Sequence, residues 1–540
     1  MTLALPPGIN ETEFANILTE FAAVVGEDWV LSSDEDVLQY RDSYSIFWGE
    51  EQEILASAAV VPDTVEQVQQ IVRIANRYRL PLYPISTGRN LTYGGSAPTL
   101  SGSVVVDLKR MNRILEVNED RHFILVEPGV SYFELYEYIK ERGLNILIDI
   151  PDPGWGSPVG NSLDHGVGYT LGHYRDHFGS HCGMEVVTPD GELMRTGMGA
   201  IPGAETWQDF HYGAGATVDG LFAQSNFGIV TKMGFWFMPM PEAHLMGTVT
   251  VPEYQDLIPL IKEVNYLEDS MLIGHTRFSS PVAGGFGGSP QLRELMSNGW
   301  PSMSQLEDYV RRQDAPAWSV SLQFYGPEET IRGTWSAVQR RIGAAITGAT
   351  FTEGRFVNLP IPPDLEADIA GKTSFGIPAL EIFRITTRNQ ANNDDPIDGH
   401  ADFFAMLPRT AQANWDCSRV IAECFQESGM AAPTSPFTTP SIFYPRCYTR
   451  VVSVPTWRDP VKNQRSRELY SRIIDRCAEN GWGAYRTSPA FQDQVVGVYS
   501  FNNHALLRFK EKLKDSIDPN GIISPGRYGV WPANMRNNQA

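Results

Sequence analysis

Basic residues are scarce in this chain. It has 540 residues, with 43 Lys and Arg against 64 Asp and Glu, which gives a net charge of −21. A surface with this excess of negative charge repels a phosphate backbone, so we expect no nucleic-acid partner. Long apolar runs are also missing, since no stretch approaches the ~18–20 residues needed to span a bilayer. We therefore expect neither a nucleic-acid-binding nor a membrane-spanning protein.

Cysteine is sparse as well, and no two cysteines form a CxxC pair. An odd number of cysteines in a long chain predicts reduced thiols and a cytoplasmic protein. The start, "MTLALPPGIN", lacks the basic region and apolar stretch of a signal peptide. No cluster of residues has metal-ligand spacing, so no metal is expected. The five cysteines, interpreted as buried structural thiols, are Cys182, Cys417, Cys424, Cys447 and Cys477.

The length allows two to four domains, and the sequence pattern changes along the chain. From about residue 58 it reads as strand, helix, strand. The helix, over 64–78, carries its apolar residues on one face, and Thr64 and Gln67 have the spacing of a capping box. The Pro-rich "MPMPEAH" marks a boundary near 240. The region from 243 to 482 then alternates strands and helices, which is α+β in character.

Several further elements have clear signals. A strand and a helix over 122–143 end at Gly143, and Pro-Asp-Gly predicts a hairpin over 183–197. A helix before 485 ends at Asn480-Gly481. The last helix is stopped by Asp518-Pro519, and its apolar residues are expected to face inward. These residues are Leu506, Phe509, Leu513 and Ile517.

Two glycine-rich segments suggest a ligand. "PISTGRNLTYGG", residues 84–95, follows an apolar strand, yet it is neither a P-loop nor a G-x-G-x-x-G fingerprint. Its backbone N–H groups could face an anion, although these residues alone also fit an ordinary turn. "DIPDPGWGSPVGNSLDHGVGYT", residues 149–170, is too long and glycine-rich for a turn. Backbone packed closely against a flat ligand explains it better, so the two segments together indicate a large cofactor.

A series of motifs matches a known family in order and spacing. The sequence resembles the vanillyl-alcohol oxidase and p-cresol methylhydroxylase family of FAD enzymes, and within it the bacterial eugenol oxidase branch. The match is strong over 50–240 and 465–535 and weak over 245–460. The motifs are "PISTGRNLTYGGSAP", "MNRILEVN", "EPGVSYFELYEYI", "PDPGWGSPVGNSLDHGVGYT", "MEVVTPDGELMRTGMGA", "QSNFGIVTKMG", "GWGAYRTSPAF" and "IDPNGIISPGRYGVWP".

The resemblance implies an α+β protein with a two-domain FAD-linked oxidase fold. An FAD-binding domain would be built from residues 1–240 and 483–540, and a cap would be built from 241–482. It also implies a homodimer, or a higher oligomer. The residues implied around the cofactor are Ser86, Thr87, Gly88, Arg89 and Asn90 at the pyrophosphate, and Ser157, Asn161, Gly166, Gly168 and Val230 along the flavin and ribityl-ADP arm.

Further flavin contacts follow from the same resemblance. His400, in "DGHADFF", matches the histidine that forms a covalent 8α-histidyl link to FAD, although a histidine after an acidic loop is usually only solvated. Arg527 would stabilise reduced, anionic flavin near its N1–C2=O end. Pro151 stands where relatives leave space for dioxygen, which favours an oxidase.

The family oxidises para-substituted phenols at the carbon attached to the ring, through a p-quinone methide. Ionising a phenol of pKa ~10 at pH 7 costs about 4 kcal/mol, so donors and a cation must surround its oxygen. Tyr93, Tyr485 and Arg486 match the family's phenolate site. Asp152 matches the carboxylate that balances the quinone methide and acts as base for water, and Tyr169 matches another pocket tyrosine. Core packing, a surface cation and a turn aspartate are the ordinary alternatives for these residues.

The chain departs from its relatives near the expected pocket. "GYTLGHYRDH" has two extra residues and brings in His173, Tyr174 and Arg175, so the pocket mouth is expected to be reshaped. "IFYPRCYTR" lacks the usual His-His pair, and "FAML" replaces the usual Ser-Pro after His400. The cap is thus divergent, and no particular para substituent is predicted.

The leading hypothesis is a 4-alkylphenol or 4-hydroxybenzyl alcohol oxidase that uses covalent FAD and O₂ and forms hydrogen peroxide. The alternative keeps the phenol but passes electrons to a cytochrome or another acceptor. A flavoprotein that binds its ligand without turnover should lack Tyr93, Asp152 or Arg486, and all three are present. A nucleotide hydrolase lacks support, because no Walker lysine is found.

Overall fold

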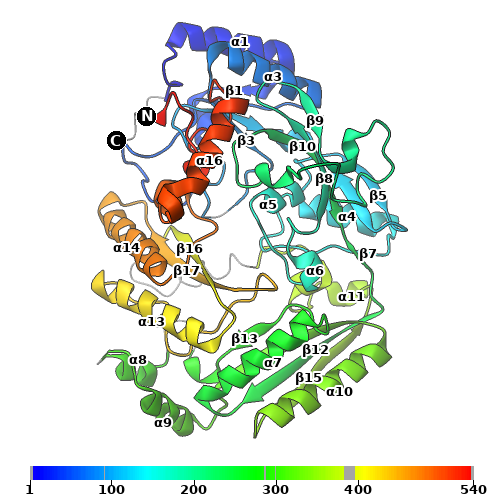
Figure 1. The fold of residues 1–540 in the computed structure, drawn as a ribbon, viewed down its shortest axis with the longest axis vertical. Helices are drawn as coiled ribbons and strands as arrows, with labels where there is room; N and C mark the ends of the chain where they lie inside the picture. Colours follow the sequence, from blue (N-terminus) through cyan, green and yellow to red (C-terminus); the bar gives the residue numbers. More distant parts are fainter. Residues whose placement is uncertain (1–3, 91, 285–287, 298, 382–395, 537–540) are drawn as a thin grey trace.

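The computed structural model describes residues 4–90, 92–284, 288–297, 299–381 and 396–536. The first part of the chain and its C-terminal part lie together at one end of the molecule, and the middle of the chain forms the other end (Figure 1). Most of the polar stretch "RNQANNDDPIDGH", residues 388–400, lies outside the described residues. Several short 3₁₀ helices connect the main elements. They are Glu27–Trp29, Leu108–Arg110, Gly197–Ala200, Asp219–Leu221, Tyr254–Asp256, Pro281–Ala283, Lys372–Phe375, Pro489–Phe491 and Arg527–Gly529.

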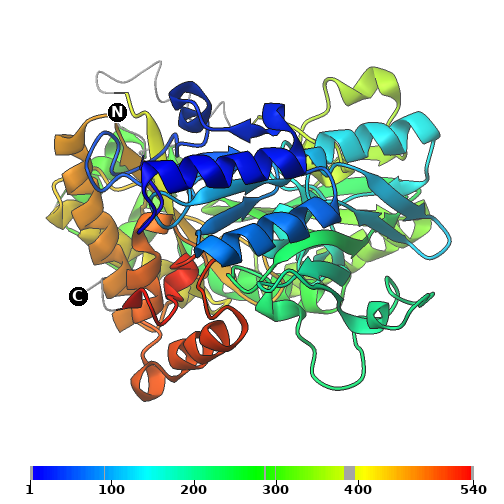
Figure 2. The same cartoon turned by 90° about the horizontal axis from the view of Figure 1, so that it is seen from above.

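The first sheet is mostly parallel. β2 and β3 both pair in parallel with β4, and β1 closes one edge in antiparallel fashion. Helices α1 and α3 lie side by side over one face (Figure 2). The strands in spatial order are β1 (Val30–Leu31), β2 (Ala58–Val60), β4 (Val104–Asp107) and β3 (Leu82–Ile85), and the helices of this region are α1 (Glu11–Val25), α2 (Asp34–Leu38) and α3 (Val65–Tyr78).

Helix α3 follows the sequence prediction closely. Thr64 caps its N-terminus by accepting a hydrogen bond from the Gln67 N–H at 3.3 Å. The Gln67 side chain accepts from the Asp63 N–H at 2.7 Å, one residue before the cap. The predicted apolar face is buried against the parallel sheet, because five apolar positions recur at helical spacing. These residues are Val65, Val68, Ile71, Val72 and Ala75.

The C-terminal part of the chain adds to this sheet. The Leu82 N–H donates to the Ile522 carbonyl at 2.7 Å, and the Ser524 N–H donates to the Leu82 carbonyl at 2.8 Å. Ile522 and Ile523 are fully buried in the same apolar cluster as Ile71. The edge of β3 is thereby completed by residues more than four hundred positions away in sequence.

The second sheet is antiparallel, and α4 packs on it. The predicted hairpin is present, with Glu185 opposite Arg195. Ser131 and Glu134 form a capping box at the start of α4, and Gly143 ends the helix at φ 61°. The strands in spatial order are β5 (Ile114–Asn118), β6 (Phe123–Val126), β10 (Ile229–Trp236), β8 (His181–Val187) and β9 (Leu193–Arg195), with α4 (Tyr132–Arg142), α5 (Pro158–Leu163), α6 (Gly172–Arg175) and the pair β7 (Ile146–Leu147) and β11 (Met238–Pro239).

The middle of the chain contains a four-stranded antiparallel sheet and a long two-stranded one. Helices α7 and α10 lie over the first, and α13 and α14 pack on the second (Figure 1). The elements are β12 (Ala243–Val251), α7 (Leu257–Asp269), β13 (Arg277–Ser279), α8 (Pro290–Met296), α9 (Met303–Gln313), β14 (Trp318–Gly326), α10 (Glu328–Ala345), β15 (Thr350–Asn358), α11 (Pro363–Glu366), β16 (Gly399–Leu407), α13 (Ala411–Glu427), β17 (Tyr448–Thr456), α14 (Pro460–Glu479) and α15 (Gln492–Gly497).

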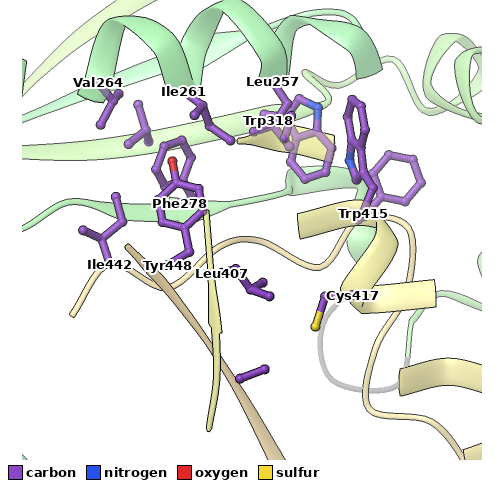
Figure 3. Packing of buried hydrophobic residues seen from close by; sticks show 14 of the residues in the cluster. Leu257, Ile261, Val264, Phe278, Trp318, Leu407, Trp415, Cys417, Ile442 and Tyr448 are labelled. Atoms are coloured by element: carbon purple, nitrogen blue, oxygen red, sulfur yellow. The ribbon is translucent and has the colours of Figure 1, made fainter. Parts of the chain in front are cut away.

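The apolar cores follow the same division. One cluster joins residues 243–495 with Ile46 and includes Trp318, Trp415 and Ile442 (Figure 3). Two others join residues 9–237 with 522, 523 and 530. The chain thus builds one body from its two ends and another from its middle, with 482–495 packed in the core of the middle.

The predicted inward face of the last helix is wrong for three of its four residues. Helix α16 (Phe501–Ile517) exposes Leu506, Phe509 and Ile517, at 53%, 58% and 39%. Only Leu513 is partly buried against an apolar core, as predicted. The fully buried residue is Lys514, whose ammonium donates to the Asp518 carboxylate at 2.7 Å and to the carbonyls of Asn226 and Ile523. The apolar spacing therefore predicted a face that is mostly exposed to solvent. Helix α16 is anchored instead by Lys514, which is paired with Asp518.

Candidate active site

The first glycine-rich loop leaves the carboxyl end of parallel strand β3. Gly88 has φ 63°, in the left-handed region, and a Cβ there would lie 2.2 Å from the Ser96 hydroxyl, so only glycine fits. Asn90 folds the loop on itself by exchanging two hydrogen bonds with Gly95, at 2.9 and 3.0 Å. Thr87 is half-buried and Arg89 is exposed. The loop has the tight backbone that a phosphate cradle requires.

The second glycine-rich segment lies directly against the first. Ser157 caps α5, and its hydroxyl donates to the Pro128 carbonyl at 2.6 Å. A Cβ on Gly160 would lie 2.1 Å from the Ser86 hydroxyl, so the two segments touch there. A Cβ on Gly166 would lie 1.9 Å from the Asn161 side-chain oxygen. The two segments thus form one continuous glycine-rich surface, which suits close contact with a large, flat cofactor.

Two further residues of the expected cofactor site, Gly168 and Val230, pack against other parts of the protein. Gly168 approaches Asp149 so closely that a Cβ would overlap its carboxylate, and its N–H donates to the Arg175 carbonyl at 3.0 Å. Val230 is buried in β10, within the core of the antiparallel sheet. These two residues shape the backbone beside the segments that carry polar groups.

An aromatic cluster surrounds a single arginine. The Arg486 guanidinium carbon lies 4.1 Å from the centroid of the Tyr93 ring and 5.4 Å from that of Tyr485. Phe404 closes the group, with its ring centroid 5.7 Å from Tyr93 and 5.8 Å from Tyr485. Three residues that the sequence singled out are thus brought together, and Phe404 is a fourth that it missed.

The charges in this cluster are well defined. Burial raises the pKa of Tyr93 well above its usual value, although the charge of Arg486 opposes the shift. Burial works against the charge of Arg486, but Tyr485, Tyr93 and the nearby Asp164 carboxylate keep its pKa well above its usual range. The arginine is therefore a permanent cation beside neutral Tyr93.

Two polar atoms of the cluster are unused. Within the described part of the chain, the Tyr485 hydroxyl and the Arg486 Nε are buried without a hydrogen-bond partner. Buried polar groups are normally paired, because an unpaired one costs ~1–3 kcal/mol. Arg486 Nε can only donate and the Tyr485 hydroxyl can donate, so one acceptor would suit both atoms, and an anionic oxygen suits the adjacent guanidinium best.

Asp164 connects this cluster to Arg527. Its carboxylate lies 3.7 Å from Arg486 Nη1 and 3.3 Å from Arg527 Nη2. Arg527 also donates to the Tyr83 hydroxyl at 2.7 Å, and its pKa is raised because Tyr83 and Asp164 outweigh the effect of burial. Asp164 is not among the residues expected from the sequence, although it lies within the stretch "NSLDHG".

Asp152 and Tyr169 form a second group. Burial, assisted by the charge of Glu381 and opposed by Arg277, raises the pKa of Asp152 to about 6. The Asp152 charge in turn contributes to the raised pKa of Tyr169, after burial. Pro151 is buried just before Asp152. The structure thus places these two residues close to each other.

The two groups are not directly bonded. Among the described residues, no hydrogen bond or ion pair joins Asp152 to Tyr93, Tyr485 or Arg486, and Asp152 Oδ1 is buried without a hydrogen-bond partner. A carboxylate with a raised pKa and an unused oxygen is a common feature of functional sites. The site therefore contains two separate groups: a cationic group around Arg486 and an acidic group around Asp152.

His400 lies on β16 and faces the aromatic cluster. Alternate residues of a strand share one face, so His400, Asp402 and Phe404 point the same way. The His400 Nε2 lies 3.5 Å from the Asp402 carboxylate, and its ring centroid lies 5.2 Å from that of Tyr44. Burial opposes its protonation, yet the hydrogen bond and charge of Asp402 raise the pKa of His400. The nearby Asp402 charge also contributes to the raised pKa of Tyr93.

The divergent segments also reach the site. Arg175 is fully buried, and His173 stacks on Trp236 with their ring centroids 6.1 Å apart. From "IFYPRCYTR", Tyr444 packs its ring edge-on against Tyr485, with centroids 5.5 Å apart. No sequence signal marked Tyr444, because its role depends on the fold of the cap.

Other kinds of site find no support in the described ranges. Among those residues, no helix is long and apolar enough to cross a bilayer. The same residues contain no group of three or more His, Cys, Asp or Glu side chains that could hold a metal ion.

Comparison with known proteins identifies the class. Residues 56–197 match the family model for an FAD binding domain, the region that holds both glycine-rich segments. The protein is an FAD-dependent oxidoreductase with a two-body α+β fold. The chain is 31% identical over 547 aligned residues to the flavoprotein subunit of 4-cresol dehydrogenase [hydroxylating] from Pseudomonas putida, covering 97% of each chain. It belongs to the p-cresol methylhydroxylase family, as the motifs predicted.

Solved structures agree over the whole chain. A 4-ethylphenol oxidase from Gulosibacter chungangensis, in complex with isoeugenol, is 32% identical with a TM-score of 0.80, covering 98% of this chain and 100% of that one. p-Cresol methylhydroxylase with substrate bound is 29% identical with a TM-score of 0.81, covering 98% and 99%. The predicted FAD-linked fold is therefore confirmed.

Proposed function

We propose that this enzyme oxidises para-substituted phenols, such as 4-alkylphenols and 4-hydroxybenzyl alcohols, at the benzylic carbon. The observation that carries the proposal is the position of Arg486 between Tyr93 and Tyr485. A phenolate oxygen beside Arg486 would accept hydrogen bonds from the Arg486 Nε–H and the Tyr485 hydroxyl, which otherwise have no partner. The ring of the phenol would lie among Tyr93, Phe404 and Tyr485.

The energetics support this arrangement. Binding a phenol of pKa ~10 as its anion at pH 7 costs about 4 kcal/mol. A hydrogen bond to a charged group contributes about 1.5–3 kcal/mol, so two or three such bonds offset this cost. The phenol proton leaves to solvent, and the raised pKa of Tyr93 keeps that hydroxyl a donor.

Asp152 has the properties of the second reacting group. FAD, when bound, supplies the acceptor for a hydride from the benzylic carbon. Loss of hydride from a phenolate gives a neutral p-quinone methide, which is electrophilic at that carbon. With a pKa of about 6, Asp152 is ionised at neutral pH and can take a proton from water that attacks this carbon. Tyr169 would line the same end of the pocket.

The cofactor residues are proposed on the same basis. Ser86, Thr87, Gly88, Arg89 and Asn90 would hold the FAD pyrophosphate through the loop after β3. Along the flavin and its ribityl-ADP arm we place Pro151, Ser157, Asn161, Gly166, Gly168, Val230, Arg527 and, through a covalent histidyl bond, His400.

The electron acceptor is proposed to be dioxygen, reduced to hydrogen peroxide. Pro151 supports this choice, as does the similarity to a 4-ethylphenol oxidase. The alternative is a cytochrome or other acceptor, which the similarity to a 4-cresol dehydrogenase supports. The outer parts 1–240 and 483–540 would form the FAD domain and 241–482 the cap of a cytoplasmic homodimer or higher oligomer, which light scattering after gel filtration can measure.

The test uses the purified protein with 4-ethylphenol and with vanillyl alcohol. Oxygen uptake and peroxide formation, matched one to one with product, are expected. Turnover only with an artificial dye would select the dehydrogenase alternative. Absence of product with every acceptor would contradict the proposal as a whole.

A further inference from the structure

The segment 442–446 runs from the apolar core to the site. Ile442 is buried in the core of the middle body, close to Tyr448 and Phe278 (Figure 3). The next residue, Phe443, packs its ring edge-on against Tyr169, with centroids 6.5 Å apart. Tyr444 packs against Tyr485. Two adjacent side chains thus contact both the acidic and the cationic group of the site.

This segment is fixed to the FAD-binding side by three contacts. Arg175 Nε donates to the Phe443 carbonyl at 2.7 Å, and the Tyr444 hydroxyl donates to the His165 carbonyl. A Cβ added to Gly172 would lie 3.2 Å from Pro445 Cγ, so the backbone also approaches closely there. The divergent stretch "GYTLGHYRDH" therefore meets the divergent stretch "IFYPRCYTR".

Arg175 is itself held in place by charge. Its side chain is fully buried, and its Nη2 pairs with the Glu268 carboxylate on α7. Arg409 pairs with the other oxygen of Glu268 at 2.8 Å. Removing one member of a buried ion pair leaves the other uncompensated, so these charges hold one arrangement firmly. Arg175 thus links the core of the cap to the Phe443 backbone.

We infer that Phe443 and Tyr444 form the cap-side wall of the substrate site and set its selectivity, with Arg175 as their positioning residue. This inference rests on the proposed phenol site. Phe443 lies beside Tyr169, the neighbour of Asp152, so it bounds the space for the para substituent. Tyr444 lies beside Tyr485, so it bounds the ring positions next to the phenol oxygen. Since its hydroxyl is engaged by His165, Tyr444 acts through its ring.

The two ends of the wall can be tested separately. Phe443→Ala should raise the kcat/KM ratio of 4-pentylphenol to 4-ethylphenol about tenfold or more, the scale of one or more methylene groups in an apolar pocket. Tyr444→Ala should instead raise the ratio of 2-methoxy-4-ethylphenol to 4-ethylphenol. Arg446→Gln is the matched control, because Arg446 lies on the same segment with 78% of its side chain exposed. Both ratios should stay within twofold in this control.

Arg175→Lys and Arg175→Met test the positioning role. Lysine can keep the charge near Glu268 but cannot provide the second donor to the Phe443 carbonyl, so both ratios should shift in both variants, mainly through KM. Unchanged ratios in the folded Arg175 variants would overturn the positioning role. If those variants do not fold, Phe443→Ala and Tyr444→Ala decide the inference alone.

The outcomes separate this inference from the proposed function. If the wild type is active and both kcat/KM ratios stay within twofold of wild type in Phe443→Ala and Tyr444→Ala, only the inference about the wall is refuted. A wild type that neither oxidises nor binds any 4-alkylphenol, measured by calorimetry, would refute the phenol site and the wall together.

Discussion

The guanidinium of Arg486 stacks on the ring of Tyr93, with its central carbon 4.1 Å from the ring centroid. Tyr93 belongs to the same loop as Gly88, whose tight backbone suits a phosphate cradle. One loop therefore joins the proposed phosphate cradle to the aromatic cluster. A change in this loop is expected to alter the relative position of flavin and substrate, which makes the Arg486–Tyr93 contact the first to test.

Replacing Arg486 should remove the stabilisation of the phenolate. Arg486→Met is expected to lower kcat/KM for 4-ethylphenol by about 10²–10³, the scale of losing one preorganised donor to an oxyanion. Arg486→Lys should recover only part of this loss, because an ammonium lacks the planar fork. Steady-state kinetics measure both effects. Arg472→Gln, a partly exposed arginine on α14, serves as the control. Activity of Arg486→Met within threefold of wild type would refute the phenolate site.

The raised pKa of Asp152 predicts a pH profile. Because the carboxylate is protonated below about pH 6, kcat/KM should fall as the pH drops through that value. Asp152→Asn should be less active and should lose this limb of the profile. Rates measured between pH 5 and 9 with 4-ethylphenol test both points. A limb that persists in Asp152→Asn would assign it to another group.

The same shift has a consequence for stability. The folded-state pKa of Asp152 lies above the usual value of 3.8, so the folded protein binds this proton more tightly than the unfolded chain. Ionised Asp152 therefore destabilises the fold increasingly as the pH rises from about 4 through 6. Asp152→Asn should raise the melting temperature at pH 8 and leave it nearly unchanged at pH 4. Equal shifts at both values would contradict the raised pKa.

His400 should carry the flavin covalently. After denaturation, wild-type protein is expected to show flavin fluorescence in its band on an acid-soaked SDS gel. His400→Ala should bind FAD that is released on denaturation. His122→Asn, which changes an exposed histidine, should keep the fluorescent band. Free flavin in the supernatant of acid-precipitated wild type would refute the link.

Lys514 should matter more for stability than the apolar residues around it. Lys514→Met leaves the buried Asp518 carboxylate without its cation, so a loss of about 3 kcal/mol in the free energy of unfolding is expected. Phe509→Gln should change stability by less than about 0.5 kcal/mol, because this side chain is 58% exposed. Chemical denaturation at pH 7 compares the two. Equal losses in the two variants would contradict the claim that Lys514 anchors α16 more strongly than the apolar stripe does.

Part of this architecture could be predicted from sequence. Helix α3 was predictable because its caps and apolar spacing are local signals. The buried face of α3 was predicted correctly because its apolar residues pack on an apolar sheet. The prediction for α16 was wrong for most of its residues, because they face solvent. The glycine segments were informative because a Cβ at Gly88 or Gly160 would overlap a serine hydroxyl.

The missed residues share a different cause. Phe404 lines the aromatic cluster, while its neighbour Phe403 packs in the core against Tyr470. Only strand alternation and the pairing of β16 decide which phenylalanine faces the site. Tyr444 reaches Tyr485 because Arg175 and His165 hold its segment from another part of the chain. Contacts of this kind arise from tertiary structure and leave no local pattern.

The pairing of Leu82 with residues 522–524 constrains the order in which the protein can be completed. During synthesis, β3 emerges long before its C-terminal partners, so its edge stays open while the whole middle of the chain is made. The middle body has its own core and can fold in that interval. The body built from the two ends of the chain can close only after residues 522–524 have left the ribosome. FAD binding is therefore expected to follow their emergence, and a nascent chain halted before residue 522 should retain little FAD.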